Sequence, residues 1–454
     1  MNTKPAAVGP IRIRRSARRP ACLLVLMLTF AACPAAVQAA ATNVVVPDDV
    51  VAAALAHSPE LHSAAKQVEA AAARERAARA GQYPSVALDL RASRYAGLEE
   101  ASLGPGIVIP EIDNRFSAAV ILSQPLYTGE RITSLQRSTA WQRAAAGAQR
   151  RSTETTLRLQ ALRAYWDWSK SFFQADSLRA SVARVEAHAA DMHNLHEAGL
   201  ATDNDALATD VLLDQTRLRL EDAQARIDLA RARIGFLTGC EPAPDAMPLQ
   251  PAPAAPAVPD EADALAAAHT NRPERAAQAA DLQAAAAQAQ AVAADRRPQV
   301  FLRAGYEQAQ PNPYFFPPAE QWDDDAFAGV VVSWTIFDAG LDRAHLAEAH
   351  ARVDQARLRL QAVDDEIALD VKAGRIALAN ALRRVPVAEH AEQSARRNIE
   401  SATDLWDSGL ARHADVLDAQ ASLIDAQYQT IAARADVALA RAELEFALGP
   451  TAGE

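Results

Sequence analysis

Two aspartates near the C-terminal end of the chain, Asp415 and Asp418, have a type and a spacing that suit electrostatic chemistry. They stand three positions apart in a stretch that we expect to be helical, so both carboxylates should lie on one face, one turn apart. Such a pair can attract cations, although two acids on a charged helix are more often a solvated face. Val416 and Leu417 stand between them and would let the helix bury its other side.

Three histidines, His188, His193 and His196, form a second group beside acidic neighbours. His193 and His196 are spaced i, i+3 and could hold a metal ion, but a solvated helix face is the commoner explanation. We therefore predict no metal site and no cofactor. The chain also lacks a P-loop, a G-x-S-x-G elbow, an H-E-x-x-H helix and paired C-x-x-C ligands, so we predict that it is not an enzyme.

The elements that must position these residues are mostly long helices. Half of the 454 residues are hydrophobic, many of them alanine, whereas aromatic residues make up 5 % and there are 17 glycines. Alanine costs least in a helix and lets neighbouring helices approach closely. This composition favours packed helices over a globular enzyme core.

Residues 1–39 predict an export signal. Arginines precede an apolar run over residues 21–32, and small residues surround Ala39, so we expect cleavage after Ala39 or Ala41. A retained membrane helix needs about 20 apolar residues, and a proline and a glutamine interrupt this run. Lipidation at Cys33, in a sequence that imitates a lipoprotein box, is the alternative.

Cleavage after residue 39 changes the formal net charge from −11 to about −17, because the removed segment has six basic and no acidic side chains. A strongly acidic chain argues against a polyanionic partner, so we expect no nucleic acid. Cleavage would also leave Cys240 as the single, unpaired cysteine of the mature chain.

The mature chain consists of two halves that repeat one another. Pro59 and Pro84 recur 214 positions later, and Gly199 and Gly239 recur 210 positions later. A nearly constant offset indicates a duplication, and the segment Cys240–Asp260, with seven prolines, should be an extended connector. We predict a first repeat over residues 40–239, a connector over 240–260, a second repeat over 261–449 and a tail over 450–454.

Each half should contain a helix, two strands, a long helix, a break and a returning helix. Asp48 or Asp49 can cap the first helix, which should continue to about Ala80. The first long helix should run from about Arg131 to Glu197, about 100 Å at 1.5 Å per residue. Its counterpart should be kinked at Pro386.

Alternating side chains predict the strands. Val86, Leu88 and Leu90 share one face of the first, a second runs from Phe116 to Leu122, and the other half repeats them over residues 300–304 and 327–337. Loops containing proline, over 104–106 and 311–318, separate each pair. Six aromatic residues near the strand ends are either core residues or a membrane-interface girdle: Tyr83, Phe116, Tyr127, Trp322, Trp334 and Phe337.

Strands of about ten residues can cross a bilayer, but four of them cannot close a barrel. Open edges are not tolerated in lipid, so the missing strands must come from other copies of the chain. A dimer would supply eight strands, a trimer twelve and a tetramer sixteen.

Several motifs together resemble those of the TolC-like outer-membrane efflux proteins, in their order and over nearly all of the mature chain. They are Ser58 to Leu61, Tyr83-Pro84, Gln124 to Gly129, Ala164 to Trp166, and the two glycine-leucine pairs Gly199-Leu200 and Gly409-Leu410. The resemblance implies an α+β membrane protein of two tandem repeats, with long helices in an α-barrel and four strands per chain in an oligomeric transmembrane β-barrel.

The resemblance also implies a function and partners. The chain would form a homotrimer in the outer membrane, in contact with its lipid, and extend into the periplasm. It would be the exit duct of a tripartite efflux or type I secretion system and would bind a periplasmic adaptor that bridges to an inner-membrane transporter. The alternative is that the chain is itself such an adaptor, but adaptors should show one hairpin within β-rich domains.

Positions at the predicted tips match the family's periplasmic gate. Asp415 and Asp418 would place six carboxylates around a narrow throat in a trimer, favour cations and raise some of their pKa values by repulsion. Trp406 matches the gate aromatic, and Asp205 stands where a partnering acid is expected.

The chain departs from the family pattern at Ala411, which replaces the basic residue that ties the gate shut in the best-known members. Arg412 is adjacent but would point about 100° away on a helix. The closed state would then be held by Arg412 paired with Asp205, or by packing alone. The tips Gly199-Leu200 and Gly409-Leu410 would present apolar side chains to the adaptor.

Overall fold

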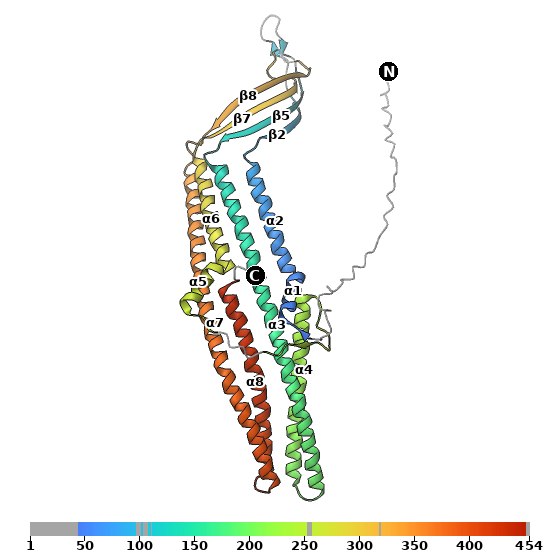
Figure 1. Ribbon diagram of the computed structural model, residues 1–454. Coiled ribbons are helices and arrows are strands. Elements are labelled where there is room, and N and C mark those ends of the chain that lie inside the picture. The colour runs from blue at the N-terminus through green and yellow to red at the C-terminus, as the bar shows by residue number, and fades with distance from the viewer. Residues whose placement is uncertain are drawn as a thin grey trace, which may run out of the picture.

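The computed structural model describes residues 44–96, 101–102, 108–109, 111–251, 257–316 and 319–450. Long helices lead from a four-stranded sheet at one end to two hairpin tips at the other (Figure 1). The predicted signal, its cleavage sites, Cys33, the loop 104–106 and residues 451–454 lie outside the described residues. Among the residues described, no helix is both long enough and apolar enough to cross a membrane.

Each half begins with two short helices, where we predicted one. They are α1 (Pro47–His57) and α2 (Pro59–Ala80), then α5 (Glu261–Asn271) and α6 (Pro273–Ala293). Ser58 and Arg272 adopt extended backbone angles at the breaks, because the residue before a proline is disfavoured in the α region. The predicted cap was also wrong: Val46 is the N-cap of α1, and the two aspartates lie in its first turn.

The predicted long helices are confirmed. Each half has a helix of 67 residues followed by one of 36: α3 (Arg131–Glu197) with α4 (Asp203–Thr238), and α7 (Leu341–Asp407) with α8 (His413–Leu448). Pro386 lies inside α7 without ending it. Each pair forms a hairpin, and α3 also packs against α2, α6 and α8. The two halves therefore stand side by side as one bundle.

The sheet has the antiparallel order β2-β5-β7-β8, with β2 (Ser85–Arg94), β5 (Asn114–Tyr127), β7 (Gln299–Gln310) and β8 (Asp323–Ser333). Each half contributes one hairpin, and the two pair through β5 and β7. The last strand begins four residues earlier than predicted and ends before Trp334. Its acidic start, Asp323 to Asp325, pairs with β7, and this long-range pairing outweighs the low strand propensity of aspartate.

One face of the sheet is apolar across all four strands. Leu88, Val120 and Tyr306 are directly opposite one another in the register, so they share this face. Its side chains are largely exposed, with Leu90 at 72 %, because none of the described helices covers it (Figure 1). The six strand-end aromatics are exposed as well, so they are not core residues of this chain.

The described part of the segment that we predicted to be a connector, residues 240–251 and 257–260, is held against the bundle. Within it, β6 (Met247–Pro248) pairs with β1 (Val44–Val45). The buried hydroxyl of Tyr165 donates to the Val45 carbonyl at 2.9 Å and accepts from the Leu249 amide at 2.8 Å. A second small pair joins β3 (Ala101–Ser102) and β4 (Val108–Ile109).

Cys240 follows α4 and is disulfide-bonded in the full-length chain. That Cys240 is the single cysteine of the mature chain after cleavage stays a prediction.

Candidate functional site

Both hairpins turn by the same backbone device. Gly199 and Gly409 each have a φ of +73°, a conformation that glycine adopts without strain. The amides of Leu200 and Leu410 donate 2.8 Å hydrogen bonds to carbonyls five residues earlier, and the glycine amides donate to carbonyls three residues earlier. This Schellman arrangement leaves the two leucine side chains 74 % and 77 % exposed at the tips.

The helices that return from the two tips start differently. In α4, Thr202 caps the helix: its hydroxyl accepts from the Asp205 amide, and the Asp205 carboxylate accepts from the Thr202 amide, both at 3.2 Å. In α8, the Asp415 carboxylate accepts from the Arg412 amide and guanidinium, both at 3.1 Å. Arginine has no acceptor to return this bond, so only half of the reciprocal box exists in α8.

These contacts decide where Arg412 points. It pairs with Asp415 on its own helix, whereas Asp205 is bonded to Thr202, so the expected Arg412–Asp205 pair is not formed. Hydrogen bonds from Arg412 lower the pKa of Asp415, and the hydrogen bond from Thr202 lowers that of Asp205. Asp418 lies one turn beyond Asp415 and is exposed.

A cluster that the sequence analysis did not identify joins the hairpins behind these acids. We call His188, Thr209, Trp406 and His413 the tip histidine cluster. His413 is 2 % exposed, and its Nε2 lies 2.8 Å from the Thr209 hydroxyl of the other hairpin. Its ring stacks on His188 with centroids 5.0 Å apart and contacts Trp406 at 5.2 Å. All four helices of the two hairpins therefore contribute to the cluster.

A sequence signal for this burial existed. His413, Val416, Ala419 and Leu423 follow helical spacing, and all four are buried. His413 thus lies in the apolar stripe of α8. Extending the apolar spacing by one turn towards the tip would have predicted its burial.

Nearer the sheet, charged pairs join the hairpins. Arg163 on α3 pairs with Glu443 on α8 at 2.8 Å, and Asp436 accepts from Lys170 at 3.0 Å and from Arg384 at 3.1 Å. We call these five residues the charged interface. It links α3, α7 and α8 at a level where the helices are still far from their tips.

Between the charged interface and the tips, the contacts across the hairpins are both charged and neutral. Arg219 of α4 pairs with Asp425 of α8 at 2.7 Å, and the Arg226 guanidinium donates to the Tyr428 hydroxyl at 2.7 Å. Charged contacts between the hairpins therefore extend from the charged interface to Arg219–Asp425, and at the tips the described link is the neutral tip histidine cluster.

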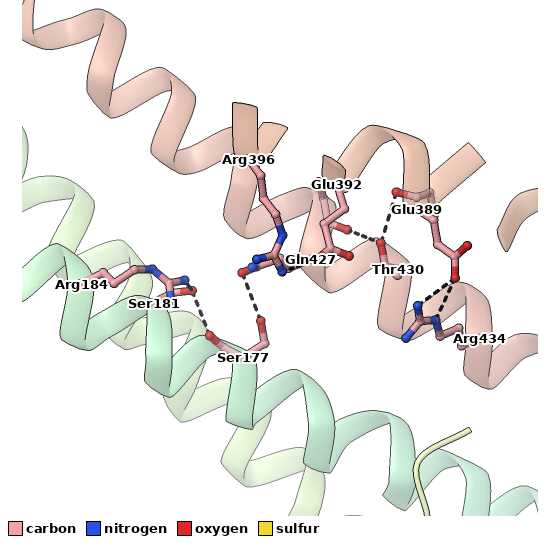
Figure 2. Close-up of polar contacts among 11 residues, drawn as sticks. Ser177, Ser181, Arg184, Glu389, Glu392, Arg396, Gln427, Thr430 and Arg434 are labelled. Carbon is pink, nitrogen blue, oxygen red and sulfur yellow. Dashed lines mark hydrogen bonds and ion pairs between the residues drawn. The ribbon is translucent and has the colours of Figure 1, made fainter. Parts of the chain in front are cut away.

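Figure 2 shows Ser177 of α3 and Gln427 of α8 facing one another, with a hydrogen bond of 3.4 Å. In the same view, Glu389 pairs with Arg434 at 2.8 Å, which joins α7 to α8 within one hairpin.

The two histidines of the alternative metal pair, His193 and His196, do not converge. His193 Nε2 contacts Asp210 at 3.2 Å, and His196 Nδ1 contacts the Ala201 carbonyl at 3.3 Å. Among the described residues, no group of three or more histidine, cysteine or acidic side chains could hold a metal ion.

Comparison with known proteins adds independent findings. The family model for outer membrane efflux proteins matches residues 50–240 and 264–450. No curated protein matches the sequence. The fold is similar to a solved structure of CusC, with 18 % identity over 89 % of this chain and 92 % of that one and a TM-score of 0.76.

Two further structures are equally similar in fold. A membrane protein of Pseudomonas aeruginosa has 21 % identity, covering 89 % of this chain and 93 % of that chain, with a TM-score of 0.76. The outer membrane protein VceC of Vibrio cholerae has 19 % identity, covering 89 % and 96 %, with the same TM-score.

Proposed function

Because this chain belongs to the outer membrane efflux protein family, it is an outer-membrane channel that extends into the periplasm, and we propose how it assembles and works. Three copies close one twelve-stranded barrel and continue it as a helical tube. The tube binds a periplasmic adaptor, which bridges to an inner-membrane transporter of an efflux or type I secretion system. The alternative of an adaptor is set aside, since the match is to a channel family over both halves.

The observation that carries this proposal is the sheet. Its apolar face is exposed across four strands, and among the described strands β2 and β8 each pair on one side only. In lipid, exposed strand edges leave backbone groups without partners. Strands from further copies would satisfy both edges and turn the apolar face towards lipid.

Assembly is tested by fractionating cells that express the chain. We expect it in the outer membrane as oligomers that resist detergent and dissociate on heating, with a mass of three chains. A soluble monomer would contradict the proposal.

A pair of variants tests the orientation of the sheet. Leu88→Arg places a charge on the apolar face, which should cost about 2–4 kcal/mol near the membrane centre and strongly reduce the amount of oligomer. Ala87→Arg changes the neighbouring residue on the opposite face and should be tolerated. Equal loss in both variants would reject the proposed lipid-facing side.

We further propose that the tips form the gate of the tube. In a trimer, Asp415 and Asp418 would supply six carboxylates around the axis, with Trp406, Asp205 and Arg412 in the surrounding wall. The exposure of Asp418 and the partial exposure of Asp415 support this placement. Gly199-Leu200 and Gly409-Leu410 would bind the adaptor, supported by the exposure of both leucines.

The proposed boundaries follow the helices and the connector. Residues 1–39 would be the export signal, 40–239 and 261–449 the two repeats, 240–260 the connector and 450–454 a tail. The equal lengths of α3 and α7, and of α4 and α8, support this division.

A further inference from the structure

The tip histidine cluster contains a ring nitrogen whose protonation state follows from its contacts. The Thr209 hydroxyl has one hydrogen and donates it to the Asp205 carbonyl at 2.8 Å. Its oxygen must then accept from His413 Nε2 at 2.8 Å, because a hydroxyl cannot donate twice. The proton of neutral His413 is therefore on Nε2, and Nδ1 is unprotonated.

The other ring nitrogen of His413, Nδ1, has no acceptor for a second proton in the part of the chain that the structure describes. His413 Nδ1 is buried, and among the described residues it has no hydrogen-bond partner; the same holds for His188 Nε2. A protonated Nδ1 would be a buried donor without an acceptor, which is costly. The two stacked rings, 5.0 Å apart, would also repel each other if both became charged.

The charged groups around the cluster come from three helices. Asp191 acts on His188 from α3, and Asp205 acts on His413 from α4. On α8, Arg412 and Asp415 pair with one another, and α7 contributes the uncharged Trp406. Neither acid forms a hydrogen bond to a cluster ring among the contacts described, so neither supplies the missing acceptor.

We propose that the tip histidine cluster is a proton-sensitive contact that keeps the two hairpins together while neutral and releases them when His188 or His413 is protonated. The proposal rests on the proposed function, in which the tips close the periplasmic end of the channel. Acidification of the periplasm would then favour the open state. The charged interface further up, together with the Arg219–Asp425 pair that lies nearer the tips, would act as the fixed end about which the tips separate.

The direction of the pH effect follows from burial. Burial lowers the pKa of both histidines below the ordinary value of 6.5; proximity to the other ring lowers that of His413 further, and Asp191 and Asp205 oppose these effects in part. Opening exposes the rings and returns their pKa values towards 6.5. The closed state therefore loses stability as the pH falls below 6.5, by up to about tenfold in the opening equilibrium for each unit by which closure depresses a pKa.

The test uses the purified full-length oligomer in planar lipid bilayers. Conductance is measured between pH 7.5 and 5.5, above the range in which most carboxylates titrate. The open probability of the wild type should rise severalfold as the pH falls. In His188→Leu with His413→Leu, which keeps apolar bulk but cannot be protonated, it should not change with pH.

The matched control is His193→Gln with His196→Gln, which removes two exposed histidines from the same hairpin and should keep the wild-type response. An equal pH response in the leucine and wild-type channels, or no response in the wild type, would overturn the proposal. If no preparation conducts at all, the proposed channel assembly fails, which is a separate result.

A spectroscopic measurement covers the case in which the leucine variants do not assemble. A protonated imidazole quenches tryptophan emission, and the Trp406 ring lies 5.2 Å from that of His413. The difference in emission between the wild type and Trp406→Phe reports this one indole. This difference in emission should decrease as His413 becomes protonated, and it should increase again as the His413 and Trp406 rings separate. A pH-independent difference between pH 7.5 and 5.5 would contradict the proposal.

Discussion

The two ends of the contact between the hairpins use different chemistry. At the charged interface, Asp436 bonds to two cations from two other helices. At the tip histidine cluster, the link is a neutral hydrogen bond and a ring stack. Carboxylate pairs with lysine and arginine keep their charges near neutral pH, whereas imidazole changes charge there. The difference separates a part of the tube that should stay fixed from a part that can open.

The tips should respond most strongly to charge on their exposed leucines. Leu200→Asp with Leu410→Asp should abolish crosslinking to the adaptor, because a facing apolar surface cannot bury the carboxylates. Oligomers should remain in the membrane, since the charged interface is untouched. The measurement is crosslinking in whole cells, with Leu200→Met and Leu410→Met as the conservative control. If the double aspartate variant were still crosslinked to the adaptor, Leu200 and Leu410 would not form the adaptor-binding site.

The proposed gate acids should be next in effect. Asp415→Ala with Asp418→Ala should remove cation selectivity and weaken block by multivalent cations by about tenfold or more, because a ring of carboxylates around a narrow throat favours cations. Reversal potentials and block are measured on reconstituted channels.

Asp404→Ala with Asp407→Ala removes the same charge from exposed positions near the tip end of α7 and should change both properties less. Equal effects of the two double substitutions would show that Asp415 and Asp418 belong to an ordinary solvated helix face.

The charged interface should show the smallest effect. Asp436→Ala leaves Lys170 and Arg384 without their shared carboxylate, and since all three are partly exposed the loss should be about 1 kcal/mol. Thermal dissociation of the oligomer measures it. Asp176→Ala is the control, since Asp176 is 71 % exposed and lies near an arginine of its own helix. If Asp436→Ala changed the pH response of the channel without loss of stability, the charged interface and the tip histidine cluster would not have separate roles.

Local patterns in the sequence predicted much of the fold. The alternation at Val86, Leu88 and Leu90 predicted a strand face that the register confirms, and glycine spacing predicted both tips. The break before Pro59 also follows from a local steric rule, which we did not apply, so that error came from the interpretation of the sequence.

Only the tertiary structure decided the partners of the tip residues. Arg412 bonds to Asp415 instead of Asp205, and His413 meets a threonine 204 positions away. Periodicity and turn residues act between neighbours in the chain, so they determine where helices, strands and tips form. A hydrogen bond between the hairpins depends on how α3 and α4 of one hairpin pack against α8 of the other, and a small rotation of any of these helices would exchange one set of partners for another.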